Sequence, residues 1–261
     1  MDAAGQIMRR APSAMMDPVL WIRIGILVPL LVIWQGLALS GLLYRDVVPP
    51  LQVVAHALLS LWLDTSFYSH IAITAYEVLC ALVFGAIAGI ATGLALGLSR
   101  FLKDAFERYL YCLGPVPKIV FFPIMIMWFG VGTGSKVAIG ALSSFFPICL
   151  STAMGMRSLS PVLVQVGRSF RASGWQTVTK IYLPAMRAPI VNGIRLGFGI
   201  ALIAVLLAET KISNQGLGFL VIQDFQQFNM PAMYALIITI FIIAIGANTL
   251  ITHAARRIGA A

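Results

Sequence analysis

Residues 78–99 read VLCALVFGAIAGIATGLALGLS, and this uncharged stretch decides the class of fold. It is long enough for a membrane span, since a helix needs ~20 mostly apolar residues to cross ~30 Å of hydrocarbon. Four glycines, Gly85, Gly89, Gly93 and Gly97, recur at intervals of four on one helical face. In lipid, small residues at this spacing let helix backbones approach closely. We therefore predict a membrane helix whose glycine face packs on another helix, either inside the bundle or in a dimeric or sliding contact.

The whole chain shares this apolar character. Of its 261 residues, 60% are hydrophobic and 10% are charged, and the mean hydropathy is +0.93. Soluble domains carry about 25% charged residues, and a globule of this size could not enclose so large an apolar excess. The surplus must face lipid, so the composition excludes an ordinary soluble protein.

Six mostly apolar segments are long enough to span a membrane. They are Ile24–Tyr44, Val78–Ser99, Tyr109–Ser135, Val137–Met156, Ile190–Glu209 and Met230–Thr252; the third contains Lys118, and the fifth contains Arg195 and ends at Glu209, so its uncharged centre is only Leu196–Ala208. We expect an all-α, polytopic membrane protein with six transmembrane helices in a single domain, residues 1–261. The first segment exceeds the 7 to 15 apolar residues typical of a signal peptide, so we expect it to be retained.

A seventh apolar stretch, Val47–Leu63, has a different pattern. It follows Pro49-Pro50 and carries polar residues at Gln52, His56 and Ser60, a spacing of four that places them on one helical face. This predicts an amphipathic helix that lies on the membrane surface or against the bundle.

The basic residues predict the orientation of the chain in the membrane. Six spans place 14 of the 18 Lys and Arg residues on the same side of the membrane as the N-terminus. These are Arg9, Arg10, Arg23, Arg100, Lys103, Arg108, Arg157, Arg168, Arg171, Lys180, Arg187, Arg195, Arg256 and Arg257. Arg45, Lys136 and Lys211 fall on the other side, and Lys118 is ambiguous. By the positive-inside rule, both termini are cytoplasmic. The net charge of +9 thus reports membrane orientation and does not indicate a nucleic-acid partner.

The sequence offers no pattern typical of an enzyme or of a metal site. The three cysteines and three histidines are scattered without ligand spacing. The stretch Gly130–Lys136 superficially resembles a phosphate-binding loop, but Ser135 and Val137 replace the required glycine and hydroxyl residue. We interpret it as a turn and expect no catalytic residue, no metal and no nucleotide on this chain.

The connection at residues 157–188, which we call the coupling loop, has helix signals of its own. Ser160-Pro161 is an N-cap followed by proline at the first helical position. Ser173 and Gln176 have the spacing of a capping box, so they predict a second helix that ends near Leu183-Pro184. Two short amphipathic helices between membrane spans favour docking to a cytoplasmic partner. Contact with the inner leaflet is the alternative.

The coupling loop resembles the EAA segment of bacterial ABC-importer permeases. That segment has Glu-Ala-Ala, three residues, Gly, then about nine residues to Ile-x-Leu-Pro, whereas residues 165–184 read QVGRSFRASGWQTVTKIYLP. Arg171 stands where the family has its glycine. A non-glycine residue in a left-handed turn costs ~1 kcal/mol, so either the turn is rebuilt with Gly174 or Arg171 contacts the partner.

Similarity extends over roughly residues 49–257 and is greatest to permeases of the nitrate, sulfonate, bicarbonate and taurine type. The short motifs that match this family are Pro115-Val-Pro117, Pro123, Trp128–Gly132, Ser135-Lys136, Phe146-Pro147, Ala208-Glu209 and Gly216–Gly218. The resemblance implies a type I ABC-importer permease fold in the bacterial inner membrane. It also implies a permease homodimer, two cytoplasmic ATPase subunits that hold ATP and Mg, and an external binding protein.

The resemblance also assigns roles to residues. Those implied to contact the ATPase are Gly167, Arg168, Phe170, Arg171, Ala172, Ser173, Gly174 and Trp175. For the solute pathway, Glu209 is the first candidate because an ionisable group at a membrane helix end is seldom idle, although it could equally be an interfacial anchor. Ser143, Ser144 and Thr210 offer further hydroxyl groups.

The expected solute has two alternatives. The resemblance favours an anion such as nitrate, a sulfonate or taurine. However, many relatives carry Arg where this chain has Glu77, and the outer segments hold Asp46, Asp64, Glu77, Glu209 and Asp224. This acidic face favours a neutral or cationic heterocycle, such as a thiamine-precursor pyrimidine. A secondary transporter is the alternative of another class, but the two halves of the chain show no internal repeat.

Overall fold

The computed structural model describes residues 18–42 and 47–257, and all regular secondary structure in this part of the chain is helical. It divides into two compact units, one up to His56 and the other from Ala57 onward. The first unit holds α1 (Pro18–Leu39) and the start of α2 (Leu51–Leu63). There, the Trp34 indole N–H donates to the Pro49 carbonyl at 3.1 Å, and the Gln35 side chain accepts from the Leu51 N–H at 3.0 Å. The helix predicted after Pro49-Pro50 is confirmed as α2.

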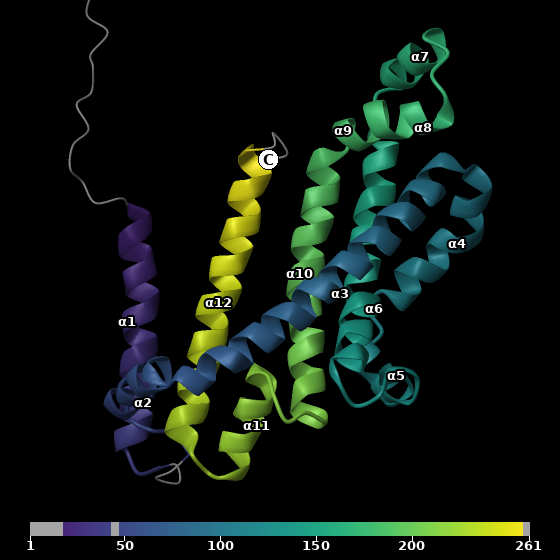
Figure 1. The fold of residues 1–261 in the computed structure, drawn as a ribbon. Helices are drawn as coiled ribbons and strands as arrows, with labels where there is room; N and C mark the ends of the chain where they lie inside the picture. Colours follow the sequence, from purple (N-terminus) through teal and green to yellow (C-terminus); the bar gives the residue numbers. More distant parts are fainter. Residues whose placement is uncertain (1–17, 43–46, 258–261) are drawn as a thin grey trace, which may run out of the picture. The chain divides into compact units, whose positions relative to one another are not determined.

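The second unit contains most of the described helices (Figure 1). In chain order they are α3 (Thr65–Leu98), α4 (Arg100–Leu113), α5 (Phe122–Phe129), α6 (Thr133–Arg157), α7 (Pro161–Ser169), α8 (Gly174–Thr177), α9 (Leu183–Ala185), α10 (Arg187–Lys211), α11 (Leu217–Gln226) and α12 (Met230–Arg257). In Figure 1, α7 to α9 lie at the same end of this bundle as the C-terminal end of α12, which we call the α7 end. We call the opposite end, which holds α11, the α11 end.

Glycine contacts hold α3, α6 and α10 together. A Cβ atom at Gly93 of α3 would lie 2.6 Å from both the Cys149 carbonyl oxygen and Thr152 Cβ of α6. On the other side of α6, a Cβ at Gly193 of α10 would lie 2.8 Å from Ser151 Cβ. Gly85, Gly89 and Gly97 also face α6. In the 18-residue apolar stretch of α6, 50% is buried, whereas the corresponding value in α12 is 17%. Helix α6 is therefore the central helix of the unit.

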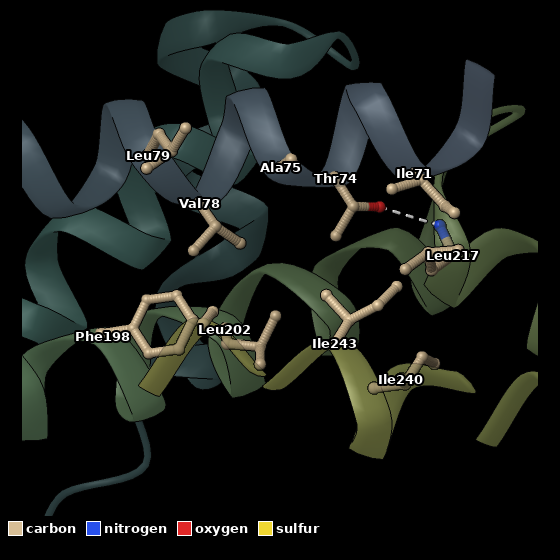
Figure 2. A pocket seen from close by; sticks show the side chains of 11 residues that line it. Ile71, Thr74, Ala75, Val78, Leu79, Phe198, Leu202, Leu217, Ile240 and Ile243 are labelled. Atoms are coloured by element: carbon tan, nitrogen blue, oxygen red, sulfur yellow. Dashed lines mark hydrogen bonds between the residues drawn. The ribbon is translucent and has the colours of Figure 1, made fainter. Parts of the chain in front are cut away.

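A small apolar cavity of about 190 Å³ is lined by residues of α3, α10, α11 and α12 (Figure 2). Leu79, Leu202, Ile240 and Ile243 are among its lining residues. Among the described residues of its wall, Thr74 carries the one polar side chain. The cavity therefore suits hydrocarbon better than a polar solute.

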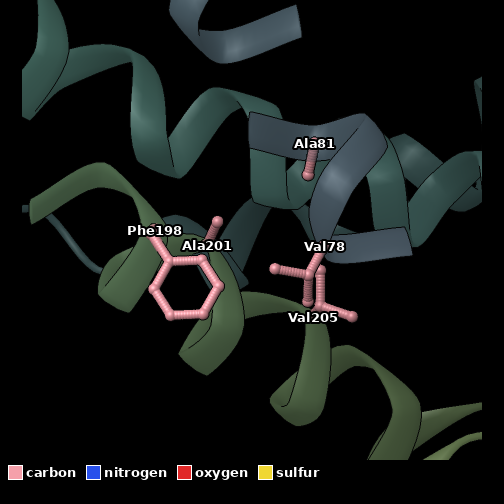
Figure 3. Packing of buried hydrophobic residues seen from close by; sticks show 5 residues of the cluster. All are labelled: Val78, Ala81, Phe198, Ala201 and Val205. Carbon is pink, nitrogen blue, oxygen red and sulfur yellow. The ribbon is translucent and has the colours of Figure 1, made fainter. Parts of the chain in front are cut away.

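Beside this cavity, α3 and α10 bury a hydrophobic cluster (Figure 3). It consists of Val78, Ala81, Phe198, Ala201 and Val205. Small side chains dominate it, and a Cβ at Gly140 of α6 would lie 2.7 Å from Ala81 Cβ and 2.9 Å from Val205 Cγ2. The three helices thus pack almost backbone to backbone at this level.

The predicted third span, Tyr109–Ser135, is wrong as a single helix. The chain instead makes α4, a 3₁₀ turn at Lys118–Phe121 and α5, and the two parts meet at an angle of 93°. Pro115 and Pro117 fall in the break. Proline cannot donate a backbone hydrogen bond, and it disfavours a helical conformation in the residue before it.

Two predicted helix starts also need correction. α3 begins at Thr65 and α6 at Thr133, ahead of the predicted Val78 and Val137. The predicted Gly130–Lys136 turn is therefore confined to residues 130–132, and Lys136 is helical. Within residues 18–42 and 47–257, four helices, α3, α6, α10 and α12, are long and apolar enough to cross a membrane, and the bent α4–α5 pair would be a fifth. The count of six spans and the cytoplasmic termini stay predictions.

Candidate functional site

The first helix of the coupling loop, α7, ends in a left-handed turn formed by Arg171. This residue has φ 47°, and the Ala172 N–H donates to the Gly167 carbonyl at 3.1 Å. A hydrogen bond from an N–H to the carbonyl five residues earlier, closing around a left-handed residue, is the Schellman motif. Its left-handed position normally favours glycine. The alternative of a turn rebuilt with Gly174 is wrong, because Arg171 itself keeps the left-handed conformation and Gly174 starts α8.

The capping box predicted at Ser173 is confirmed. The Gln176 N–H donates to Ser173 Oγ at 3.3 Å, and the Ser173 N–H donates to Gln176 Oε1 at 3.0 Å. The helix continues through a π-helical turn at Val178–Tyr182 into α9 and breaks at Met186. It thus passes the predicted end at Leu183-Pro184, and Pro184 lies directly after the π-helical turn.

The coupling loop packs on itself and leaves two aromatic side chains outside. Gly167 is buried, and a Cβ there would lie 2.7 Å from Ile181 Cδ1. Tyr182 is also buried, whereas Phe170 is 83% exposed and Trp175 is 76% exposed. Large exposed aromatic side chains beside a basic residue, Arg171, form a surface suited to a protein partner.

The other predicted loop residues frame the same turn. Ser173 and Gly174 are exposed and Ala172 is half-buried, while the side chain of Arg168 lies outside the described residues. Both neighbouring spans are connected directly to this structure, since α6 ends at Arg157 and α10 begins at Arg187. The loop is therefore joined directly to α6 and α10, two helices that pack closely on each other.

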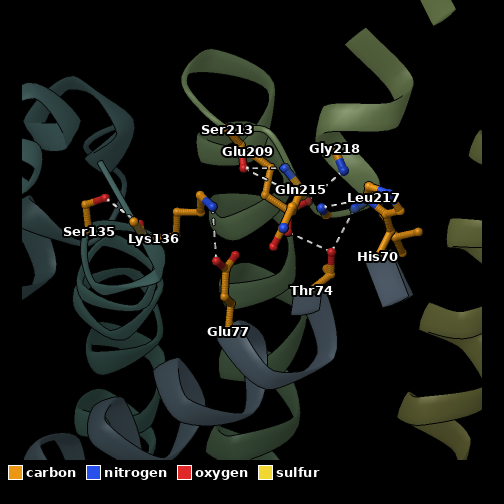
Figure 4. Close-up of polar contacts among 12 residues, drawn as sticks. His70, Thr74, Glu77, Ser135, Lys136, Glu209, Ser213, Gln215, Leu217 and Gly218 are labelled. Carbon is orange, nitrogen blue, oxygen red and sulfur yellow. Dashed lines mark hydrogen bonds and ion pairs between the residues drawn. The ribbon is translucent and has the colours of Figure 1, made fainter. Parts of the chain in front are cut away.

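At the α11 end, Glu209 is the centre of a buried polar network (Figure 4). The Thr74 hydroxyl donates to Glu209 Oε1 at 2.7 Å, and the Gly218 N–H donates to Oε2 at 2.6 Å. Thr74 Oγ1 in turn accepts from the Leu217 N–H at 2.8 Å. This network fixes the segment before α11 to both α3 and α10.

Gly216 allows the segment to approach Glu209 so closely. It has φ 105°, and a Cβ there would overlap the Glu209 carboxylate. The Gly216 N–H also donates to His70 Nδ1 at 3.0 Å. Glu209 could be predicted from the sequence, whereas Thr74 and His70 could not, because their position on the same face of α3 becomes informative only when the residues that they contact are known.

A buried ion pair lies beside this network. Lys136 Nζ is 3.1 Å from Glu77 Oε1, and the two side chains are 5% and 0% exposed. Glu77 Oε2 has no hydrogen-bond partner among the described residues. Glu77 and Lys136, counted in the sequence as separate outer charges, therefore neutralise each other inside the bundle.

The predicted pathway residues are not gathered around a cavity in this conformation. Glu209 and Ser144 are fully buried, and Ser143 donates to the Ile139 carbonyl of its own helix at 2.7 Å. Thr210 is half-buried and donates to the Leu207 carbonyl at 2.8 Å. Their role in a pathway stays a prediction.

Comparison with known proteins identifies the family. Residues 81–260 match the family described as "Binding-protein-dependent transport system inner membrane component". The chain belongs to this family. It is therefore an ABC-importer permease of the inner membrane, as the resemblance implied, and such permeases work with a separate ATPase and a binding protein.

Three relatives of this permease family are informative. The chain is 30% identical over 203 residues to the taurine transport system permease protein TauC of Escherichia coli, covering 76% of this chain and 74% of that protein. It is 31% identical over 211 residues to the putative aliphatic sulfonates transport permease protein SsuC of Bacillus subtilis, covering 80% and 76%. It is 28% identical over 201 residues to the formylaminopyrimidine transport permease protein ThiX of Halalkalibacterium halodurans, covering 75% and 78%. All three are named as transport permease proteins.

A solved structure shares the permease fold. A chain from an inward-facing conformation of the MetNI methionine ABC transporter superposes with a TM-score of 0.66 at 16% identity, covering 72% of this chain and 94% of that chain. The predicted ABC-importer permease fold is thereby confirmed.

Proposed function

We propose that this permease forms the solute pathway of an ABC importer as a homodimer, with two cytoplasmic ATPase subunits and an external binding protein. ATP and Mg are held by the ATPase, and this chain hydrolyses nothing. The observation that carries the proposal is the exposure of Phe170 and Trp175 around the Arg171 turn, on a loop joined directly to α6 and α10.

The coupling loop is built to transmit force. Its two helices are fixed by the Arg171 turn, the Ser173 capping box and the contact of Gly167 with Ile181. The glycine contacts then join α6 to α3 and α10. Closure of an ATPase pair that grips the loop would therefore move these spans as a rigid body and alternate access to the pathway.

For the solute, we propose a small organic anion of the sulfonate class. TauC and SsuC supply the chemical precedent for this class. The acidic residues of the outer segments repel an anionic solute less than the sequence alone indicates. Glu77 is neutralised by Lys136 and Glu209 is enclosed by its hydrogen bonds, so neither carboxylate faces outward. Asp46 lies outside the described residues.

A thiamine-precursor pyrimidine is the second candidate, on the precedent of ThiX and because Asp64 and Asp224 remain near the surface of the α11 end. Hydrogen bonds from Ser66 hold the pKa of Asp64 below its usual range, so Asp64 is ionised and caps α3. Burial raises the pKa of Asp224.

The test is reconstitution of the chain in vesicles with the ATPase and binding protein encoded beside it. We expect uptake of labelled taurine or ethanesulfonate that requires ATP and the binding protein, and competition by unlabelled sulfonate but not by an aminopyrimidine. Preferential uptake of the pyrimidine would select the second candidate. Uptake by the chain alone, driven by an ion gradient, would contradict the proposal and indicate a secondary transporter.

A further inference from the structure

Lys118 lies at the break between α4 and α5, at mid-depth in the bundle. Its ammonium group donates to the carbonyl oxygens of Leu113, at 2.9 Å, and Gly114. It also lies 4.5 Å from the centroid of the Phe146 ring. Phe146 is halfway along the 25 residues of α6, so this charge is far from both ends of a membrane-spanning helix.

The Lys118 charge has no carboxylate partner among the described residues. The two ion pairs found there join Lys136 to Glu77 and Arg157 to Glu107. Carbonyl dipoles and an aromatic face solvate an ammonium group but leave its net charge uncompensated. A cation at such depth is costly, and ionisable residues inside membrane spans usually mark a solute or ion pathway.

The stem of Lys118 forms part of the wall of an open cavity of about 320 Å³. The other lining residues are apolar or aromatic, among them Phe121, Trp128 and Phe146. Trp128 is 72% exposed, so the cavity opens on the surface of the chain. Irregular backbone, as between α4 and Lys118, occurs at membrane depth where it is buried in protein or lines a cavity, and broken helices commonly form solute sites near the midplane.

We propose that Lys118 is the residue of this permease that recognises the anionic group of the solute. Its flexible four-carbon stem lets the ammonium turn from the carbonyls of α4 to a sulfonate group, while Phe121, Trp128 and Phe146 contact the hydrocarbon part. Lipid head groups lie at the membrane surface, so the depth of Lys118 favours a translocated solute as the anion. This inference rests on the proposed function and deepens it.

The experiment compares Lys118→Met and Lys118→Arg in the full complex reconstituted with ATPase and binding protein, with ethanesulfonate as the labelled solute. Lys103→Met, the same change on α4, is the matched control. We expect Lys118→Met to lower ethanesulfonate uptake at least tenfold, because a charge-assisted contact is lost. ATP hydrolysis stimulated by the binding protein should persist, and Lys118→Arg and Lys103→Met should stay within about threefold of wild type.

The outcomes separate this inference from the proposed function. If Lys118→Met takes up ethanesulfonate as well as wild type does, Lys118 serves only as a cap of α4. If Lys118→Arg is as defective as Lys118→Met, a positive charge at this position is not what uptake requires. In either case the inference is wrong while the function stands. A wild-type complex that takes up no anion overturns the proposed solute and the inference together.

Discussion

The two ends of the helical bundle differ in where a few charged and aromatic side chains are placed. At the α11 end, Glu77, Lys136 and Glu209 are buried, although charged side chains are usually exposed. At the α7 end, Phe170 and Trp175 are exposed, although aromatic side chains are usually buried. The buried charges bond to groups of the same chain, whereas the exposed aromatic side chains face outward. We infer that the α11 end is stabilised from within and that the α7 end is completed by another protein.

The largest expected effect on stability is at the buried ion pair. Lys136→Met leaves Glu77 buried without its counter-charge and should lower the free energy of unfolding by about 3–5 kcal/mol. The double variant Glu77→Gln/Lys136→Met should recover most of this loss. Lys180→Met, at an exposed position of the α7 end, should change stability by less than about 0.5 kcal/mol. Unfolding in detergent measures the stability of all three variants. Equal stability of Lys136→Met and wild type would show that the buried ion pair does not stabilise the α11 end.

A smaller effect is expected at Glu209. Glu209→Ala leaves the Gly218 N–H and the Thr74 hydroxyl without their acceptor, which should cost about 1–3 kcal/mol. Glu107→Ala is the matched change at the α7 end, where Glu107 pairs with a partly exposed Arg157. That pair should contribute only about 0–1 kcal/mol. If the two variants are equally stable, the network around Glu209 does not hold the α11 end.

The smallest expected effect is an increase in the stability of the coupling loop. Arg171→Gly relieves a left-handed conformation and should stabilise the coupling loop by about 1 kcal/mol. Hydrogen exchange of the Ala172 amide, which donates to the Gly167 carbonyl, should slow accordingly. Lys180→Gly, within a helical turn, should instead speed exchange in the loop. Faster exchange in Arg171→Gly would mean that the arginine side chain, and not the turn, orders this segment.

Local signals allowed the sequence to predict much of this molecule. The capping box depends on residues three apart, and the glycine face of α3 depends on intervals of four, so both are visible without a fold. The charge and apolar patterns gave the membrane class in the same way.

The buried polar network depends on contacts that no local pattern contains. Lys136 is 59 residues from Glu77, and Thr74 is 135 residues from Glu209. Counting spans between charges assumed that each charge marks a helix end, and this fails for a charge that is paired inside the bundle. The bend at Pro115 and Pro117 was missed because hydropathy ignores the backbone restrictions of proline.

The most direct test of the central claim is coupled uptake in Phe170→Asp and Trp175→Asp. Val162→Asp, also at an exposed apolar position of the coupling loop, is the control. We predict that both aromatic variants lose at least tenfold in ATP-driven uptake of ethanesulfonate and in association with the ATPase, with a stability within about 0.5 kcal/mol of wild type. The control should retain both activities. Wild-type uptake in both aromatic variants would show that the loop rests on lipid and does not receive the movement of the ATPase.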